Sequence, residues 1–114
     1  MAAIIKTSVT INRPVEEVWK AFMNPANLPH WLSGFVSTTT ISGQQGMPGS
    51  KNEIVLKERG KEMIVIETVQ ETTHLKHFRS TMENKQMNSE VDFRFISFGH
   101  YTEIIQTAQL IPNG

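Results

Sequence analysis

The apolar positions in the first quarter of the chain follow the period of a strand and then the period of a helix. From Ile5 to Ile11 a β-branched side chain stands at every second position, which indicates a strand with one buried face. Val15, Val18, Trp19 and Phe22 then recur at the spacing i, i+3, i+4 and i+7, so their side chains share one stripe of a helix. An amphipathic helix is therefore predicted to follow the first strand.

Two prolines bound this helix. Pro14 suits its first turn, where the missing N–H is not needed, and Pro25 prevents the helix from continuing. The segment that follows, NPANLPHW, contains two prolines and predicts a second short helix or a turn. This segment would bring Leu28 and Trp31 beside the first helix.

Six further strands are predicted after this helical region. They cover residues 34–42, 51–58, 62–70, 73–82, 87–98 and 101–110. The first of them ends in the loop GQQGMPGS, and most of the later ones are separated by short breaks with glycine or asparagine. Connections this short favour antiparallel neighbours.

Apolar side chains on one face of these strands need a cover. They are Val91, Phe93 and Phe95 in the strand over 87–98, and Met63, Val65 and Val69 in the strand over 62–70. Because the stripe over 15–22 marks the only convincing helix, it is the natural cover for that sheet face. The simplest layout is an α+β domain with the order β-α-α followed by six strands.

Composition narrows the class of protein. The chain has 114 residues, 39% of them hydrophobic, which is enough for one core and too short for two ordinary domains. Eleven basic residues balance eleven acidic ones, so nucleic acid is not an expected partner. There is no cysteine, signal peptide or apolar run long enough for a membrane span. We expect a single cytoplasmic domain over residues 1–114.

The order of these motifs resembles the START-like superfamily, which includes polyketide cyclase/dehydrase-like proteins and birch-pollen-type allergens. Pro14, Val18 and Trp19 resemble the P-x-x-V-W helix start of that family. Trp31 resembles its tryptophan after the second helix, and residues 43–50 resemble its glycine-rich loop. The resemblance spans nearly the whole chain and rests on the combination of these motifs.

The resemblance implies a helix-grip fold, in which a curved, antiparallel seven-stranded sheet wraps a long C-terminal helix around an apolar cavity. The sequence departs from it after the last strand, where LIPNG stands in place of the start of that helix. We therefore expect the long helix to be absent or truncated, and a homodimer to cover the exposed sheet. Two alternatives are that the chain has been cut short, or that the two short helices cover more of the sheet.

Neither the glycine-rich loop nor the histidines favour a bound ion. The loop lacks the Gly-Lys-Ser/Thr end of a phosphate-binding loop and precedes a strand, so a tight connection is the better interpretation. His74 and His77 are three residues apart on a predicted strand and would point to opposite faces. No metal and no cofactor are expected.

Acid–base chemistry has three candidates near the last strand, which are His100, Tyr101 and Glu103. If that strand lines the cavity, a glutamate among apolar groups would have a raised pKa and act as an acid or a base. The alternative, which we favour, is that Glu103 and Glu53 lie on the solvent face of the sheet.

Aromatic residues supply the nearest signal for a ligand. Most of them must form the core, but some are expected to line the cavity. The candidates for ligand binding are Trp31, Phe35, Tyr101, Phe22 and Phe78.

Three functions follow from these patterns and from the resemblance. The first is binding of a small hydrophobic or amphipathic molecule, which the resemblance implies. The second is an enzyme of the polyketide cyclase/dehydrase type that uses acid–base residues in the same cavity. The third is a protein–protein interaction module, similar to chaperone activators, that uses the uncovered sheet. Binding without chemistry is the leading hypothesis.

Overall fold

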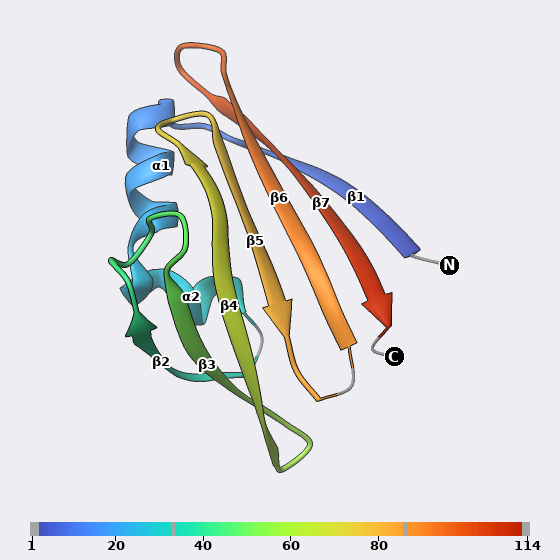
Figure 1. The fold of residues 1–114 in the computed structure, drawn as a ribbon. Coiled ribbons are helices and arrows are strands. Elements are labelled where there is room, and N and C mark those ends of the chain that lie inside the picture. The colour runs from blue at the N-terminus through green and yellow to red at the C-terminus, as the bar shows by residue number, and fades with distance from the viewer. Residues whose placement is uncertain (1–2, 33, 86, 113–114) are drawn as a thin grey trace.

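The computed structural model describes residues 3–32, 34–85 and 87–112, which form one seven-stranded antiparallel sheet with short helices on one side (Figure 1). The elements are β1 (Ala3–Ile11), α1 (Val15–Met23), the 3₁₀ helix η1 (Pro25–Asn27), α2 (Leu28–Trp31), β2 (Phe35–Ser42), β3 (Lys51–Glu58), β4 (Lys61–Thr73), β5 (His77–Glu83), β6 (Met87–Ser97) and β7 (Thr102–Pro112). The strand order is β1-β7-β6-β5-β4-β3-β2. The predicted order of one strand, two helical segments and six strands is confirmed.

The predicted apolar stripe of α1 faces the sheet. Val15, Val18 and Trp19 are buried, and Phe22 is partly buried against the same core. Met23 is the last residue of the helix, because Asn24 is extended and Pro25 follows. This face explains why the helix forms: it packs four apolar side chains against the inner face of the sheet.

The core lies between α1 and the middle strands. The indole ring of Trp19 meets the ring of Phe95 on β6 edge to face, with centroids 4.9 Å apart, and contacts the His74 ring at 5.9 Å. Val69, Phe78 and Ile104 complete the core from β4, β5 and β7. Four consecutive strands are thus packed against one helix that lies far from them in the sequence.

The predicted break between the fourth and fifth strands is misplaced. Strands were expected over residues 62–70 and 73–82, whereas β4 continues to Thr73 and β5 begins at His77. The turn between them places Leu75 in the left-handed region, with a φ of 66°. The sequence THLK carries no glycine, proline or asparagine to mark such a turn, and the peptide N–H of Phe95 donates to the Lys76 carbonyl at 2.9 Å to hold it.

Part of the inner sheet face has no helical cover among the described residues. The helices α1 and α2 lie over one side of the sheet in Figure 1, while β1 and β7 extend beyond them. Ile5 and Val9 of β1 share the inward register of the buried Ile104, yet are 54% and 51% exposed. The last strand, β7, continues to Pro112, where the described part ends.

Replacing the central aromatic residue should destabilise this core. Trp19→Ala is expected to lower the free energy of unfolding by about 3–5 kcal/mol, because it removes a large buried ring and leaves a cavity. Phe98→Ala is the matched control, since Phe98 is half exposed and should cost less than about 1 kcal/mol. Urea denaturation of both variants measures the difference, and equal losses would show that α1 does not anchor the core.

Candidate functional site

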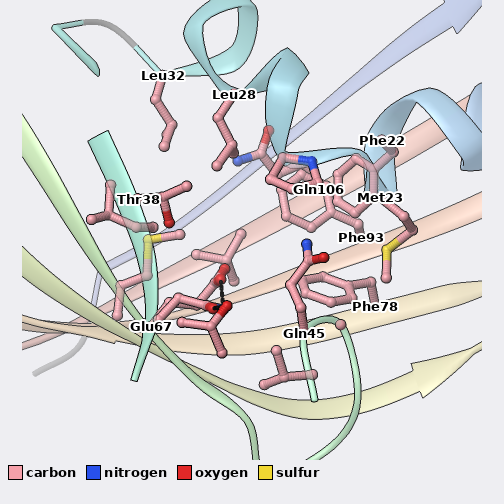
Figure 2. A pocket seen from close by; sticks show the side chains of 18 residues that line it. Phe22, Met23, Leu28, Leu32, Thr38, Gln45, Glu67, Phe78, Phe93 and Gln106 are labelled. Carbon is pink, nitrogen blue, oxygen red and sulfur yellow. Dashed lines mark hydrogen bonds between the residues drawn. The ribbon is translucent and has the colours of Figure 1, made fainter. Parts of the chain in front are cut away.

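A cavity of about 370 Å³ lies between the helices and the inner face of the sheet (Figure 2). Ligand pockets in proteins usually have volumes of roughly 300–1,000 Å³, so this one suits a small molecule. The residues that line it are Phe22, Met23, Pro25, Leu28, Leu32, Thr38, Thr40, Gln45, Gly46, Asn52, Ile54, Glu67, Val69, Phe78, Met82, Val91, Phe93 and Gln106. Most of this wall is apolar.

The aromatic part of the wall is a cluster formed by Phe22, Phe78 and Phe93. The Phe22 ring lies edge to face on Phe78, with centroids 5.5 Å apart, and on Phe93, with centroids 4.8 Å apart. Leu28 of α2 approaches the cavity from the helical side (Figure 2). Because Phe22 belongs to α1, the helix that packs on the core also supplies part of the cavity wall.

The glycine-rich loop between β2 and β3 forms another wall. Gln45 and Gly46 line the cavity. The Thr72 hydroxyl donates to the Gly46 carbonyl at 2.8 Å, and the Gly49 N–H donates to the Val69 carbonyl at 2.8 Å. These bonds tie the loop to β4, which favours its interpretation as a tight connection.

A polar cluster interrupts the apolar lining at Glu67. The amide nitrogen Nδ2 of Asn52 donates to Oε1 of Glu67 at 3.2 Å, and the Ser80 hydroxyl donates to Oε2 at 3.2 Å. The Thr40 hydroxyl in turn donates to Oδ1 of Asn52 at 3.0 Å. Ser80 and Asn52 are buried, so both partners hold the carboxyl group in a fixed position.

Burial dominates the electrostatics of this carboxyl group. It raises the pKa of Glu67 above the ordinary value of 4.5, because the charged form loses hydration. The hydrogen bonds from Asn52 and Ser80 act in the opposite direction, since they stabilise the charged form. Glu67 is the only ionisable side chain among the described residues that line the cavity, so any proton transfer there would involve this group.

The family is identified by its sequence model. The model described as polyketide cyclase / dehydrase and lipid transport matches residues 2–109. The chain belongs to this family. No curated protein matches the chain as a relative.

Solved structures show the fold of this polyketide cyclase/dehydrase and lipid transport family member. Ara h 8.0201 is similar with a TM-score of 0.83 and 14% identity, over 100% of this chain and 80% of that one. The Zhui aromatase/cyclase from Streptomyces sp. R1128 has a TM-score of 0.82 and 9% identity, over 100% and 70%. A START superfamily protein from Mycobacterium smegmatis has a TM-score of 0.79 and 11% identity, over 97% and 78%.

These similarities confirm the expected START-like helix-grip fold. At such low identity they show the fold alone and not the ligand. None of the helices in the described ranges has the length and apolar character that a membrane crossing requires.

The residues predicted to bind ligand fall in different places in this family member. Phe22 and Phe78 line the cavity, whereas Phe35 and Tyr101 do not. Phe35 pairs with Leu56 at the start of β2. Trp31 is the last residue of α2, and its side chain lies outside the described part of the structure.

The three acid–base candidates also lie away from the cavity. Tyr101 is 41% exposed and stacks on Phe98 at 4.9 Å in the connection between β6 and β7, which also contains His100. Glu103 points to the outer face, because its neighbours Thr102 and Ile104 are buried on the inner one. The preferred alternative for Glu103, an outward position, therefore agrees with the register of β7.

Sequence reasoning missed Glu67, although a signal for it existed. Val65 and Val69 were assigned to one apolar face of their strand, and Glu67 stands between them at the same period of two. A charged residue in the middle of a buried apolar face is unusual and marks a candidate site.

The histidine pair differs from its predicted arrangement. His74 lies in the β4–β5 turn against Trp19, so the two histidines do not share a strand. His77 lies on the outer face, where its Nε2 is 2.6 Å from Oδ2 of Asp92 and its Nδ1 is 3.4 Å from Oε1 of Glu71. Within the described ranges, no group of three or more histidine and carboxylate side chains has the arrangement of a metal site.

Neutralising Glu67 should change how stability depends on pH. Because the folded-state pKa is raised, the folded protein binds more protons than the unfolded chain between about pH 4.5 and the raised value, so stability falls as pH increases through that window. Glu67→Gln should remove this loss, and its advantage over the wild type should be larger at about pH 7 than at about pH 4.

Chemical denaturation across this pH range measures the effect. Glu62→Gln is the matched control, since Glu62 is an exposed glutamate on the same strand. The stability of this variant should depend on pH in the same way as the stability of the wild type. A Glu67→Gln advantage that is the same at every pH would contradict the effect of burial on this carboxyl group.

Proposed function

We propose that this chain binds a small hydrophobic or amphipathic molecule in the cavity between its helices and its sheet. The observation that carries the proposal is the cavity itself, about 370 Å³ in volume, with a mostly apolar wall. Each apolar group that a ligand removes from water contributes about 25 cal/mol per Å² of buried surface. A ligand with an apolar body is therefore the class that this wall favours.

Three further observations support this proposal. The wall combines α1, α2, the loop after β2 and strands from β2 to β7, so its shape is set by the whole fold. Its aromatic cluster of Phe22, Phe78 and Phe93 offers ring edges and faces to a ligand. The family description, polyketide cyclase / dehydrase and lipid transport, covers proteins associated with molecules of this apolar class.

Binding is preferred to catalysis because of the composition of the wall. Glu67 is its single ionisable group among the described lining residues, whereas His100, Tyr101 and Glu103 lie elsewhere. The cyclase/dehydrase hypothesis would therefore depend on Glu67 rather than on the three residues first considered.

Titration with a fluorescent hydrophobe tests the proposed function, which predicts saturable binding. Leu28→Ala should weaken the affinity by about tenfold, because it removes part of the apolar wall. Ile64→Ala is the matched control, since Ile64 is half exposed on β4 and outside the wall, and it should leave the affinity unchanged. Native mass spectrometry of freshly purified protein provides a second measurement through any co-purifying mass. Absence of saturable binding and of a bound mass would contradict the proposal.

We also propose that a second copy covers the open part of the inner sheet face. Ile5 and Val9 are half exposed there, and burying both side chains against a second copy would remove their apolar surface from water. Sedimentation velocity should show a dimer that weakens towards a monomer in Ile5→Lys. A compact monomer at every concentration would contradict self-association and leave the cavity proposal unaffected.

A further inference from the structure

Glu67 is placed where its charge has no partner of opposite sign. The described lining residues include no lysine, arginine or histidine, and the hydrogen-bond partners of the Glu67 carboxyl group, Asn52 and Ser80, are neutral. A carboxylate removed from water without an opposite charge is costly. Among the described lining residues, the cavity thus contains one acidic group and no basic group, and only neutral hydrogen-bond donors stabilise its charge.

The hydrogen bonds around Glu67 nevertheless suit its ionised form. Nδ2 of Asn52 donates to one carboxyl oxygen and the Ser80 hydroxyl to the other. The Thr40 hydroxyl occupies Oδ1 of Asn52, which orients the Asn52 amide so that its N–H faces Glu67. Two donors aimed at two oxygens match a carboxylate better than a carboxylic acid, whose own proton needs an acceptor.

A positive charge supplied by the ligand would resolve this conflict. It would compensate the carboxylate that burial disfavours, and the carboxylate would keep both of its present donors. A neutral ligand would leave the charge unpaired, and an anionic ligand would add repulsion. The charge of Glu67 therefore distinguishes between ligands that the apolar wall alone would accept equally.

We infer that the preferred ligand carries one protonated amine on an apolar body, and that Glu67 binds this amine while the aromatic cluster holds the body. The inference rests on the proposed function, because it names the class of molecule that the same cavity takes. The amine would donate to the carboxylate oxygens, which retain free lone pairs beside the bonds from Asn52 and Ser80.

The separation between Glu67 and the aromatic cluster sets the length of such a molecule. Glu67 pairs with Met82 across the β4–β5 ladder, and Phe78 lies four positions along β5 from Met82, which corresponds to about 13 Å of strand. Figure 2 shows Glu67 on one side of the cavity and Phe22, Phe78 and Phe93 on the other. An amine at one end of a short chain and a ring at the other match this separation.

Three probes with the same apolar body test the inference. They are 4-phenylbutylamine, 4-phenylbutanol and 4-phenylbutyrate, which differ in the charge of the end group. Calorimetric titration of the wild type at neutral pH should show the amine binding about tenfold more tightly than the alcohol and the carboxylate binding most weakly. Because the formal net charge of the chain is zero, general attraction of a cation does not explain such a preference.

The variant Glu67→Gln should reduce the ratio of amine to alcohol affinity to about one while the alcohol affinity stays the same. Glu62→Gln removes the same charge from an exposed position on β4 and should preserve the wild-type ratio. If Glu67→Gln does not fold, the ratio of amine to alcohol affinity in the wild type still tests the inference, and a ratio of about one would contradict it.

The outcomes separate this inference from the proposed function. If the alcohol binds in the cavity and the amine has no advantage, or if the advantage persists in Glu67→Gln, the amine inference is wrong and the cavity still binds apolar molecules. If no probe and no fluorescent hydrophobe binds, the proposed function fails and the inference fails with it.

Discussion

The contact between α1 and the inner face of the sheet is the interaction on which the rest of this structure depends. Trp19 packs against Phe95 on β6, and its helical neighbours Val15 and Val18 extend the same buried stripe. A sheet of seven strands exposes a large apolar face, and this nine-residue helix covers only part of it. The part of this face that α1 does not cover forms one wall of the cavity and the open surface near β1. The core and the site are thus two parts of the same sheet face, and the end of α1 marks the border between them.

Side-chain alternation then decides which residues reach that face. In β7 the even-numbered positions point inward, so Ile104 is buried and Gln106 lines the cavity, while Glu103 faces outward. In β4, up to the register shift after Val69, the odd-numbered positions point inward, which buries Val65 and brings Glu67 to the wall. Glu67 and Glu103 have similar neighbours in the sequence, but Glu67 points inward and Glu103 points outward. The difference arises because a shift of one residue along a strand moves a side chain to the opposite face.

Most of the fold could be predicted because its signals are local. The period of α1, its flanking prolines and the glycines between strands all act within a few residues. The turn at Leu75 could not, because a tertiary bond from Phe95 to Lys76 stabilises it without a turn residue. The site was predicted only in part: Phe22 and Phe78 line the cavity, whereas Phe35 and Tyr101 do not, because no local pattern specifies where the cavity lies.

Glu67 was overlooked for a related reason. The strand over 62–70 was predicted from its apolar residues, and the charged residue between them was not considered as a candidate for the site. Evolution towards stability alone would replace a buried carboxyl group by an apolar residue of similar size, because burial raises its pKa and disfavours its charge. This chain instead surrounds that carboxyl group with Asn52, Ser80 and Thr40, three polar side chains that no core requires. A carboxyl group whose charge is disfavoured by burial, yet is held by hydrogen bonds, is explained most directly by the ligand binding proposed for this cavity.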